Sequence, residues 1–532
     1  SSYNRTIEPY YYGIKGGSYN PSNPTDYEIE RLGTSGTDYL KTSDISKASD
    51  QTIYLDARVN YDRQFNLHHV TGMLMYMQRE YRSSVLPERN QGFSGRFTYD
   101  YGQRYLVELN FGYNGTERLA KKERFEFFPA VSLGWVISNE KFFEPMTKYI
   151  DNLKIRGSYG LVGSDETGLS AGAQHFLYID QVSLNNIGFT TGVDMNYTLY
   201  GPLVTNYAVV NGGWERVKKL DIGIDLELFR QLTITADYFN EKRYNILLHR
   251  EAWPESLGYY TAKPWSNKGK VDNWGIELSV NWRKEFTKDL YVDFRGNFTY
   301  TENKYVNLDE PVYPYVWKTS TGKPLSRTTG YIAQGLFSSQ EEIDNSPTQN
   351  LGSTVKPGDI KYRDVNGDGK IDGSDQVMIS PYGTTPRIQY GLGMNVTYKK
   401  FDFGVFFNGS AKRTIMISGI SPFGQSDYNV MQFIADDYWS ESNPNPNAKY
   451  PRLGLTSSQT ANNTVASTYW MRNGNFIRFK TLELGYKFKY GRVYLNGDNI
   501  AVFSPFKLWD PELSWNAYPL QRTFNIGVQL NF

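Results

Sequence analysis

Apolar and polar residues alternate one by one in runs that recur along most of the chain. In residues 104–114, apolar or aromatic side chains occupy every odd position from Tyr105 to Tyr113, with Leu109 at the centre. Because successive side chains of a β-strand point to opposite faces, this pattern predicts a strand with one apolar and one polar face. About fifteen such runs are predicted strands: 52–64, 68–81, 91–100, 104–114, 128–137, 152–163, 216–228, 231–242, 272–285, 289–304, 386–398, 401–410, 475–487, 490–502 and 521–532.

The connections between these runs alternate between short and long. Tight turns are predicted at 65–67, 101–103, 229–230, 286–288, 399–400 and 488–489. The connections between them are longer, and 305–385 is the longest. Segment 138–151 is an exception, because a short turn is due there and its sequence predicts a small helix. Barrels of the outer membrane have short turns at one end and long loops at the other. The parity therefore favours an all-β fold, a transmembrane antiparallel β-barrel with long extracellular loops.

The composition agrees with many thin strands rather than one large solid core. Hydrophobic residues make up 39% of the 532 residues, and aromatic residues make up 16%. No window approaches 18 consecutive apolar residues, so no transmembrane helix is predicted. Barrel strands, in contrast, cross a membrane with about 10 alternating residues each. The net charge of +1 gives no reason to expect nucleic acid as a partner, and the absence of cysteine excludes a disulfide scaffold.

The long connection 305–385 contains a calcium-loop pattern at residues 364–375. The predicted oxygen ligands are Asp364, Asn366, Asp368, Asp372 and Asp375, with the backbone carbonyl of Lys370. Gly369 at the sixth position of the loop permits the sharp turn that folds the chain around an ion. The last position is Asp instead of Glu, which shortens the bidentate reach. The alternative interpretation is a turn rich in Asp, Asn and Gly that binds nothing.

A set of ordered stretches resembles the C-terminal portion of the SusC/RagA-type TonB-dependent outer-membrane transporters of the Bacteroidetes. The stretches are FFPAVSLGWVISNEKFF (127–143), LKIRGSYGLVG (153–163), WERVKKLDIGIDLELF (214–229), NWGIEL (273–278), GYIAQGLFSSQEEI (330–343), GDIKYRDVNGDGKIDGSD (358–375), NPNAKYPRL (445–453), STYWMRNGNFIRFKTLELGYKF (467–488), DPEL (510–513) and TFNIGVQLNF (523–532). Each stretch is modest, whereas their order and spacing together are specific. One departure is Ser164, where the family usually has Asn.

The resemblance implies a barrel of 22 strands with a plugged lumen, so 22 − 15 leaves about seven strands to be supplied from elsewhere. It also implies an N-terminal plug domain, which this sequence does not contain. Residues 52–532 are then the C-terminal part of the barrel, and residues 1–51 are an external loop that could include the end of a preceding strand. The implied partners are a SusD-like surface lipoprotein, the TonB complex acting through the plug, the remainder of the barrel and membrane lipids.

Import of oligosaccharides, or less often of peptides, across the outer membrane is the function that the resemblance implies. Aromatic residues in the long loops are candidates for contact with the substrate or the lipoprotein lid: Trp253, Tyr259, Tyr260, Trp265, Trp317 and Trp515. Flat rings can stack on sugar faces, although loop packing and protein interfaces use them as readily. Carboxylates on the polar faces, such as Asp221 and Asp225, are interpreted as part of the polar, solvated inner wall of a barrel instead of a catalytic pair.

Two rival functions remain open at this stage. A passive porin or a surface adhesin built on a barrel would need no plug. GLSAG (168–172) fits a nucleophile-elbow pattern with Ser170 at its centre and His175 nearby. That motif requires a strand–turn–helix context, which the surrounding polar loop lacks. We therefore expect no enzymatic activity and no organic cofactor, with calcium as the one candidate cofactor.

Overall fold

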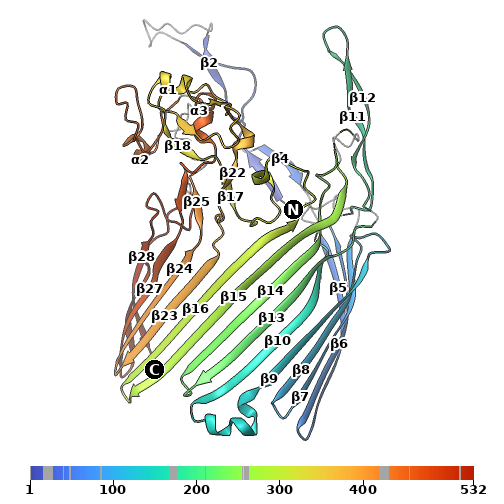
Figure 1. Ribbon diagram of the computed structural model, residues 1–532, viewed down its shortest axis with the longest axis vertical. Coiled ribbons are helices and arrows are strands. Elements are labelled where there is room, and N and C mark those ends of the chain that lie inside the picture. The colour runs from blue at the N-terminus through green and yellow to red at the C-terminus, as the bar shows by residue number, and fades with distance from the viewer. Residues whose placement is uncertain are drawn as a thin grey trace.

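One antiparallel sheet of fifteen strands dominates the structure (Figure 1). The computed structural model describes residues 2–15, 28–39, 41–46, 50–83, 87–166, 176–209, 211–254, 256, 263–417, 430–454, 456–514 and 517–531. The strands of the sheet are β5 (Gln51–Phe65), β6 (His68–Arg82), β7 (Glu88–Tyr101), β8 (Tyr105–Thr116), β9 (Phe125–Val136), β10 (Ile150–Ser164), β13 (Glu215–Leu228), β14 (Leu232–His249), β15 (Trp265–Thr287), β16 (Leu290–Asn307), β23 (Ile388–Tyr398), β24 (Phe401–Ala411), β27 (Phe476–Phe488), β28 (Gly491–Phe503) and β29 (Thr523–Leu530). Each predicted run corresponds to one of them.

Every strand pairs with the next strand of the sheet along the chain, so the sheet is a simple meander. The short connections are confirmed as tight turns. At the turn between β13 and β14, Phe229 and Arg230 have φ values of 56° and 53°. The turn spans residues 229–231, and two successive positive φ values match the right-handed twist of the flanking strands. In segment 138–151 the expected small helix is present as two short 3-10 helices, η2 (Ile137–Asn139) and η3 (Lys141–Met146).

The two faces of the sheet differ in polarity as the alternation predicts. On one face large apolar side chains are open to the surroundings, with Leu109 50% exposed, Leu133 58% and Val59 70%. Leu109 lies opposite Phe97 of β7 and Val131 of β9, so apolar residues meet across the strands. A water-soluble surface rarely carries so large an apolar area, whereas a lipid-facing barrel wall requires one. We call this the lipid face, and the opposite face the lumen face.

The first and last strands of the sheet, β5 and β29, each pair with one neighbour in the part of the chain that the structure describes. Each strand has one backbone edge without a ladder partner, and every described residue of β5 is classed as exposed. Unpaired backbone groups are costly in a bilayer, at several kcal/mol for each group. The open edges of β5 and β29 therefore need further hydrogen-bonding partners in a bilayer.

The long connections contain structure that the sequence pattern did not predict. In the segment expected as loop 164–215, β11 (Gln181–Thr191) and β12 (Tyr197–Asn206) form a hairpin that rises beyond the wall (Figure 1). Strands β14 and β15 also extend seven residues past their predicted ends and shorten the expected loop 243–271. Other elements lie at or beyond the same end of the wall: β1 (Ser2–Thr6), β2 (Tyr12–Ile14), β3 (Ile29–Arg31), β4 (Lys41–Ser46), η6 (Val316–Lys318), β17 (Thr328–Gly330), β18 (Ala333–Leu336), α1 (Gln340–Asp344), β19 (Thr348–Gln349), β20 (Ile360–Tyr362), β21 (Lys370–Ile371), η7 (Gly373–Asp375), β22 (Val377–Ser380), β25 (Thr414–Met416), α2 (Gln432–Ala435), α3 (Ser457–Thr464) and β26 (Met471–Asn473).

Helices contribute little to this architecture. None of the helices in the described ranges is long and apolar enough to cross a membrane.

Candidate functional site in the external loops

Three long connections pack together beyond the end of the wall and form one body, which we call the external loop cluster. It comprises the described residues of 308–387, 412–475 and 504–522. Its apolar core consists of Tyr331, Leu336, Ile360, Tyr362, Ile371, Ile415, Ile417, Ile434, Trp439, Ala448, Tyr450, Trp470 and Phe506. Residues from all three connections share this core, so the cluster is a packed unit. A packed unit of this kind presents a fixed surface to a ligand or partner.

A buried polar network joins two of the three connections. Asp359 is fully buried, and Arg452 forms an ion pair with it at 2.6 Å. The side-chain amide of Asn463 donates to Asp359 Oδ1 at 2.7 Å, and Asn463 Oδ1 accepts the backbone N–H of Ile360 at 2.9 Å. Burial raises the pKa of Asp359, while the charge of Arg452 and these hydrogen bonds counteract the increase. The network therefore holds residues around 359 and 452–463 in one arrangement.

The third connection is attached to the wall by Arg478 of β27, whose side chain is 1% exposed. Its guanidinium donates to both carboxylate oxygens of Asp510, at 2.7 and 2.8 Å. A further N–H donates to Glu512 at 2.7 Å, and another donates to the side-chain oxygen of Asn499. One Nη atom donates to both oxygens of Asp510, so with Nε on Glu512 and the other Nη on Asn499 all three nitrogens of the guanidinium are held. Arg478 thus anchors the DPEL segment (510–513) to the sheet.

The predicted calcium loop is present as a compact turn, and most of its side chains bond to its own backbone. Asp364 accepts from Gly367 N–H and Gly369 N–H, and the fully buried Asp375 accepts from Val365 N–H and Asp372 N–H. The predicted ligands Asn366, Asp368 and Asp372 accept from the N–H groups of Asp368, Lys370 and Ser374. Within the described residues, no three acidic or imidazole side chains converge on a metal-sized site. The contacts are those of the alternative interpretation, and calcium binding stays a prediction.

Calcium titration of the full-length receptor checks this prediction. If the loop binds the ion, calcium should raise the thermal stability of the external loop cluster in the parent protein. The double variant Asp364→Ala with Asp368→Ala should lose this calcium response, since it removes two hard oxygen ligands. A variant with Asp344→Ala in α1 is the control for an acidic residue outside the loop. If the parent and the double variant respond equally to calcium, the prediction that this loop binds calcium is wrong.

The predicted contact aromatics are fixed by packing where the structure describes them. Trp317 donates its indole N–H to the carbonyl of Ser374 at 2.8 Å and stacks on Tyr315, with the ring centroids 4.8 Å apart. Trp265 is the first residue of β15 instead of a loop residue, and its ring lies 3.6 Å from that of His249. The guanidinium of Arg250 lies 5.0 Å from the ring of Trp253. Tyr259, Tyr260 and Trp515 lie outside the described residues, as do GLSAG and His175.

The helix α1 is held at the surface of the cluster by Glu342. Its carboxylate accepts from the N–H and Oγ of Ser338 at 2.9 and 2.8 Å, and it pairs with Lys361 at 3.0 Å. These hydrogen bonds, led by the backbone N–H of Ser338, lower the pKa of Glu342 from 4.5 to about 2. The contact is therefore formed at neutral pH by an ionised carboxylate.

Acidification should release α1. A carboxylate with a lowered pKa in the folded state stabilises that state above its ordinary pKa, and the contribution is lost as the pH falls through the folded value. We expect the hydrogen-exchange protection factors of residues 338–346, which correct for the pH dependence of intrinsic exchange, to fall between pH 4.5 and about 2. In Glu342→Gln the segment should exchange faster at neutral pH and should lose this pH dependence. An unchanged profile in the variant would contradict the assignment.

The lumen face carries ion pairs among the carboxylates interpreted from the sequence as part of a polar wall. Arg156 lies within 3.3 Å of Asp221 and Asp225, and it reaches Asp237 at 2.6 Å. Arg96 and Glu108 form a similar pair at 2.6 Å. Each of these four carboxylates has an arginine nitrogen within 3.3 Å, an arrangement that suits a polar wall.

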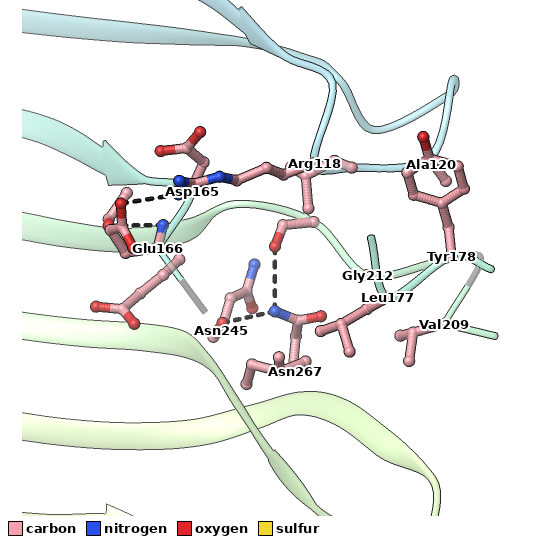
Figure 2. A pocket seen from close by; sticks show the side chains of 15 residues that line it. Arg118, Ala120, Asp165, Glu166, Leu177, Tyr178, Val209, Gly212, Asn245 and Asn267 are labelled. Carbon is pink, nitrogen blue, oxygen red and sulfur yellow. Dashed lines mark hydrogen bonds and ion pairs between the residues drawn. The ribbon is translucent and has the colours of Figure 1, made fainter. Parts of the chain in front are cut away.

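A pocket lies at the end of the wall that carries the long loops, and Arg118, Glu166 and Asn267 are among the residues that line it (Figure 2). Arg118 donates to Glu166 at 2.8 Å and to Glu88 at 2.7 Å. On another side, the amide of Asn267 donates to the carbonyls of Gly213 and Asn245 at 3.1 and 2.8 Å. Leu177 and Val209 supply apolar surface near the base of the hairpin. Among the described residues, the Asn267 side-chain oxygen is buried without a hydrogen-bond partner, whereas its amide nitrogen and Arg118 are bonded to their neighbours.

Sequence reasoning missed the residues that organise the cluster. Asp359, Arg452 and Asn463 carry no periodicity, and the residues that they join are about one hundred positions apart. The one signal is that GDIKY and PRL belong to the family-like stretches, which marks Asp359 and Arg452 without indicating that they touch.

Comparison with known proteins agrees with this architecture. The family model described as "TonB dependent receptor-like, beta-barrel" matches residues 1–500. TonB-dependent receptor P3 of Formosa agariphila is 25% identical over 527 residues, which cover 91% of this chain and 50% of the relative. TonB-dependent receptor SusC of Bacteroides thetaiotaomicron is 27% identical over 469 residues, covering 83% of this chain and 43% of the relative.

Solved structures show the same fold. The RagAB peptide transporter superimposes with a TM-score of 0.68 at 19% identity, covering 91% of this chain and 55% of that chain. This chain spans about half the length of the curated relatives that it matches. The family match over residues 1–500, the fifteen-stranded sheet and its two-faced wall lead to one conclusion. The chain belongs to the TonB-dependent receptor-like β-barrel family and supplies part of the wall of such a barrel in the outer membrane.

Proposed function

We propose that the protein containing this chain imports oligosaccharides across the outer membrane, with a SusD-like surface lipoprotein as a lid on the external loop cluster. The observation that carries the proposal is the cluster itself. A core shared by three connections, a buried polar network and the Arg478 anchor give a rigid platform at the mouth of the wall. A rigid platform suits a partner that opens and closes, because only the partner then has to move.

Energy coupling belongs to the same proposal. The TonB complex would act through a plug domain, and further strands would pair with the open edges of β5 and β29 to close the ring. The unpaired edges support this part, since backbone groups without partners are not tolerated in a bilayer. The likeness to the receptor SusC supports the transport class. Import of peptides is the second candidate, and the likeness to the RagAB peptide transporter favours it.

Growth of a receptor-deletion strain tests the substrate class. The strain should be complemented with the full-length gene and supplied with purified oligosaccharides or peptides as the sole carbon source. We expect restored growth on one oligosaccharide class, and loss of that growth when TonB is depleted. Growth restored on peptides alone would select the second candidate.

The rival functions have distinct outcomes in the same experiment. A passive porin would restore growth whether or not TonB is present. A surface adhesin would bind the glycan at the cell surface without restoring growth. Either outcome would contradict the import proposal while leaving the barrel assignment intact.

A further inference from the structure

A row of lysines crosses four neighbouring strands on the lipid face, at the end of the wall that carries the long loops. Lys218 of β13 lies directly opposite Lys242 of β14. Lys242 lies opposite Asp272 of β15, and Asp272 lies opposite Lys304 of β16. Lys270 lies two residues before Asp272 on the same face of β15, farther from the apolar surface, and it is opposite Tyr244. All four lysines are exposed.

This row borders the apolar surface. On the membrane side of the lysines, the lipid face carries the aromatic residues Tyr238, Trp274 and Tyr300. The ring centroids of Tyr238 and Trp274 are 6.4 Å apart, and those of Trp274 and Tyr300 are 5.7 Å apart. Aromatic girdles of this kind mark the interface between hydrocarbon and head groups. The lysines therefore stand at the height of the lipid head groups.

Carboxylates of the described chain do not neutralise the row, although the Lys218 ammonium lies over the ring of Tyr244, 5.4 Å from the ring centroid. In the described part of the chain, no carboxylate lies within 4.0 Å of the amino group of any of the four lysines. Asp272 is the acidic residue inside the row, which leaves a net charge of 4 − 1 = +3. Glu302, the nearest acidic neighbour toward the membrane, is already bonded to Arg387 and to the hydroxyl of Tyr300.

The lumen face of the same strands behaves differently. There, Lys219 pairs with Glu241 at 2.8 Å, and Arg243 pairs with Glu215. Like charges placed directly opposite each other destabilise a sheet, so the Lys218–Lys242 pair costs stability unless an anion lies beside it. The anion available at this height is a lipid phosphate, for which lysine is a suitable point-charge ligand.

We propose that Lys218, Lys242, Lys270 and Lys304 bind the phosphate groups of a phosphorylated glycolipid of the outer leaflet, whose acyl chains lie along the apolar face below. Four strands at a spacing of about 4.8 Å make a row about 14 Å wide. That width suits two phosphates on a large saccharide head group better than the single phosphate of an ordinary phospholipid. The inference depends on the location of the wall in the outer membrane and is independent of the nutrient imported.

Lipid retention by the purified full-length receptor tests the proposal. Native mass spectrometry should count diphosphoryl lipid A bound to the parent protein and to the quadruple variant Lys218→Gln, Lys242→Gln, Lys270→Gln and Lys304→Gln. We expect retention to fall by about tenfold or more in the variant, because several favourable charge contacts with the head group are lost together. The heat-modifiable electrophoretic mobility of the variant should show that its barrel is folded.

A matched control replaces four exposed lysines in the turns at the other end of the wall: Lys288, Lys399, Lys400 and Lys489, each to Gln. This control should retain lipid as the parent does. Equal loss in both variants, or no loss in either, would overturn the proposal.

Three further probes identify the ligand. Lipid A without phosphates should bind the parent and the quadruple variant equally weakly, and phosphatidylglycerol should bind the parent more weakly than diphosphoryl lipid A. Inorganic phosphate at the same concentration should not displace the lipid. Equal binding of phosphatidylglycerol would reject the glycolipid, and complete displacement by inorganic phosphate would indicate a free-anion site.

Discussion

Replacing Arg478 with Met should lower the free energy of opening the 504–513 segment by about 3–5 kcal/mol, because two carboxylates would be left without their buried cation. Arg478 is 1% exposed and is the residue through which Asp510 and Glu512 are held against β27. Native-state hydrogen exchange on the full-length receptor in detergent measures this opening. The change is expected to be local, since the lumen ion pairs of the distant strands share no partner with Arg478.

Two controls sharpen the test of Arg478. Lys507→Met removes an exposed cation from the same segment and should leave its exchange rates unchanged. The triple variant Arg478→Met, Asp510→Asn and Glu512→Gln removes the stranded charges and should recover part of the loss. If Arg478→Met is as well protected as the parent, the anchor has no energetic role.

Introducing Arg at position 109 should destabilise the inserted barrel by about 2–4 kcal/mol, the cost of a cation on a lipid face near mid-bilayer. Leu109 is the middle apolar position of β8 and lies between Phe97 and Val131 on the neighbouring strands. The yield of folded receptor in the outer membrane should fall, and urea unfolding of the receptor in lipid vesicles should give the change in free energy.

Glu108→Gln is the matched substitution on the other face of the same strand. Glu108 accepts from Arg96 at 2.6 Å and from Asn110 at 2.7 Å, and glutamine can keep one acceptor oxygen for these contacts. Assembly of this variant should be close to that of the parent. Equal tolerance of Leu109→Arg and Glu108→Gln would contradict the assignment of the two faces.

The calcium loop and the contact aromatics show where residue patterns stop being informative. The spacing of Asp364, Asp368 and Asp375 suits both a cation cage and a self-capped turn, because a carboxylate accepts from an amide as readily as it binds an ion. Trp317 and Trp265 met a sequence criterion for sugar stacking; their rings pack against Tyr315 and His249, and contact with a sugar or a lid stays a prediction. Residue type does not indicate which neighbour a ring will find.

By itself, the sequence determined the strands, their order, their turns and the polarity of each face. Those features depend on the period of two along a single strand and on the length of each connection, and both are local. Only the tertiary structure decided how 359, 452 and 463 meet, that Arg478 anchors 510–512, and that lysines of four strands form one row. The contacts of 359, 452, 463 and 478 join residues far apart in sequence and are selected by packing, and the lysine row becomes visible once the register of all four strands is known.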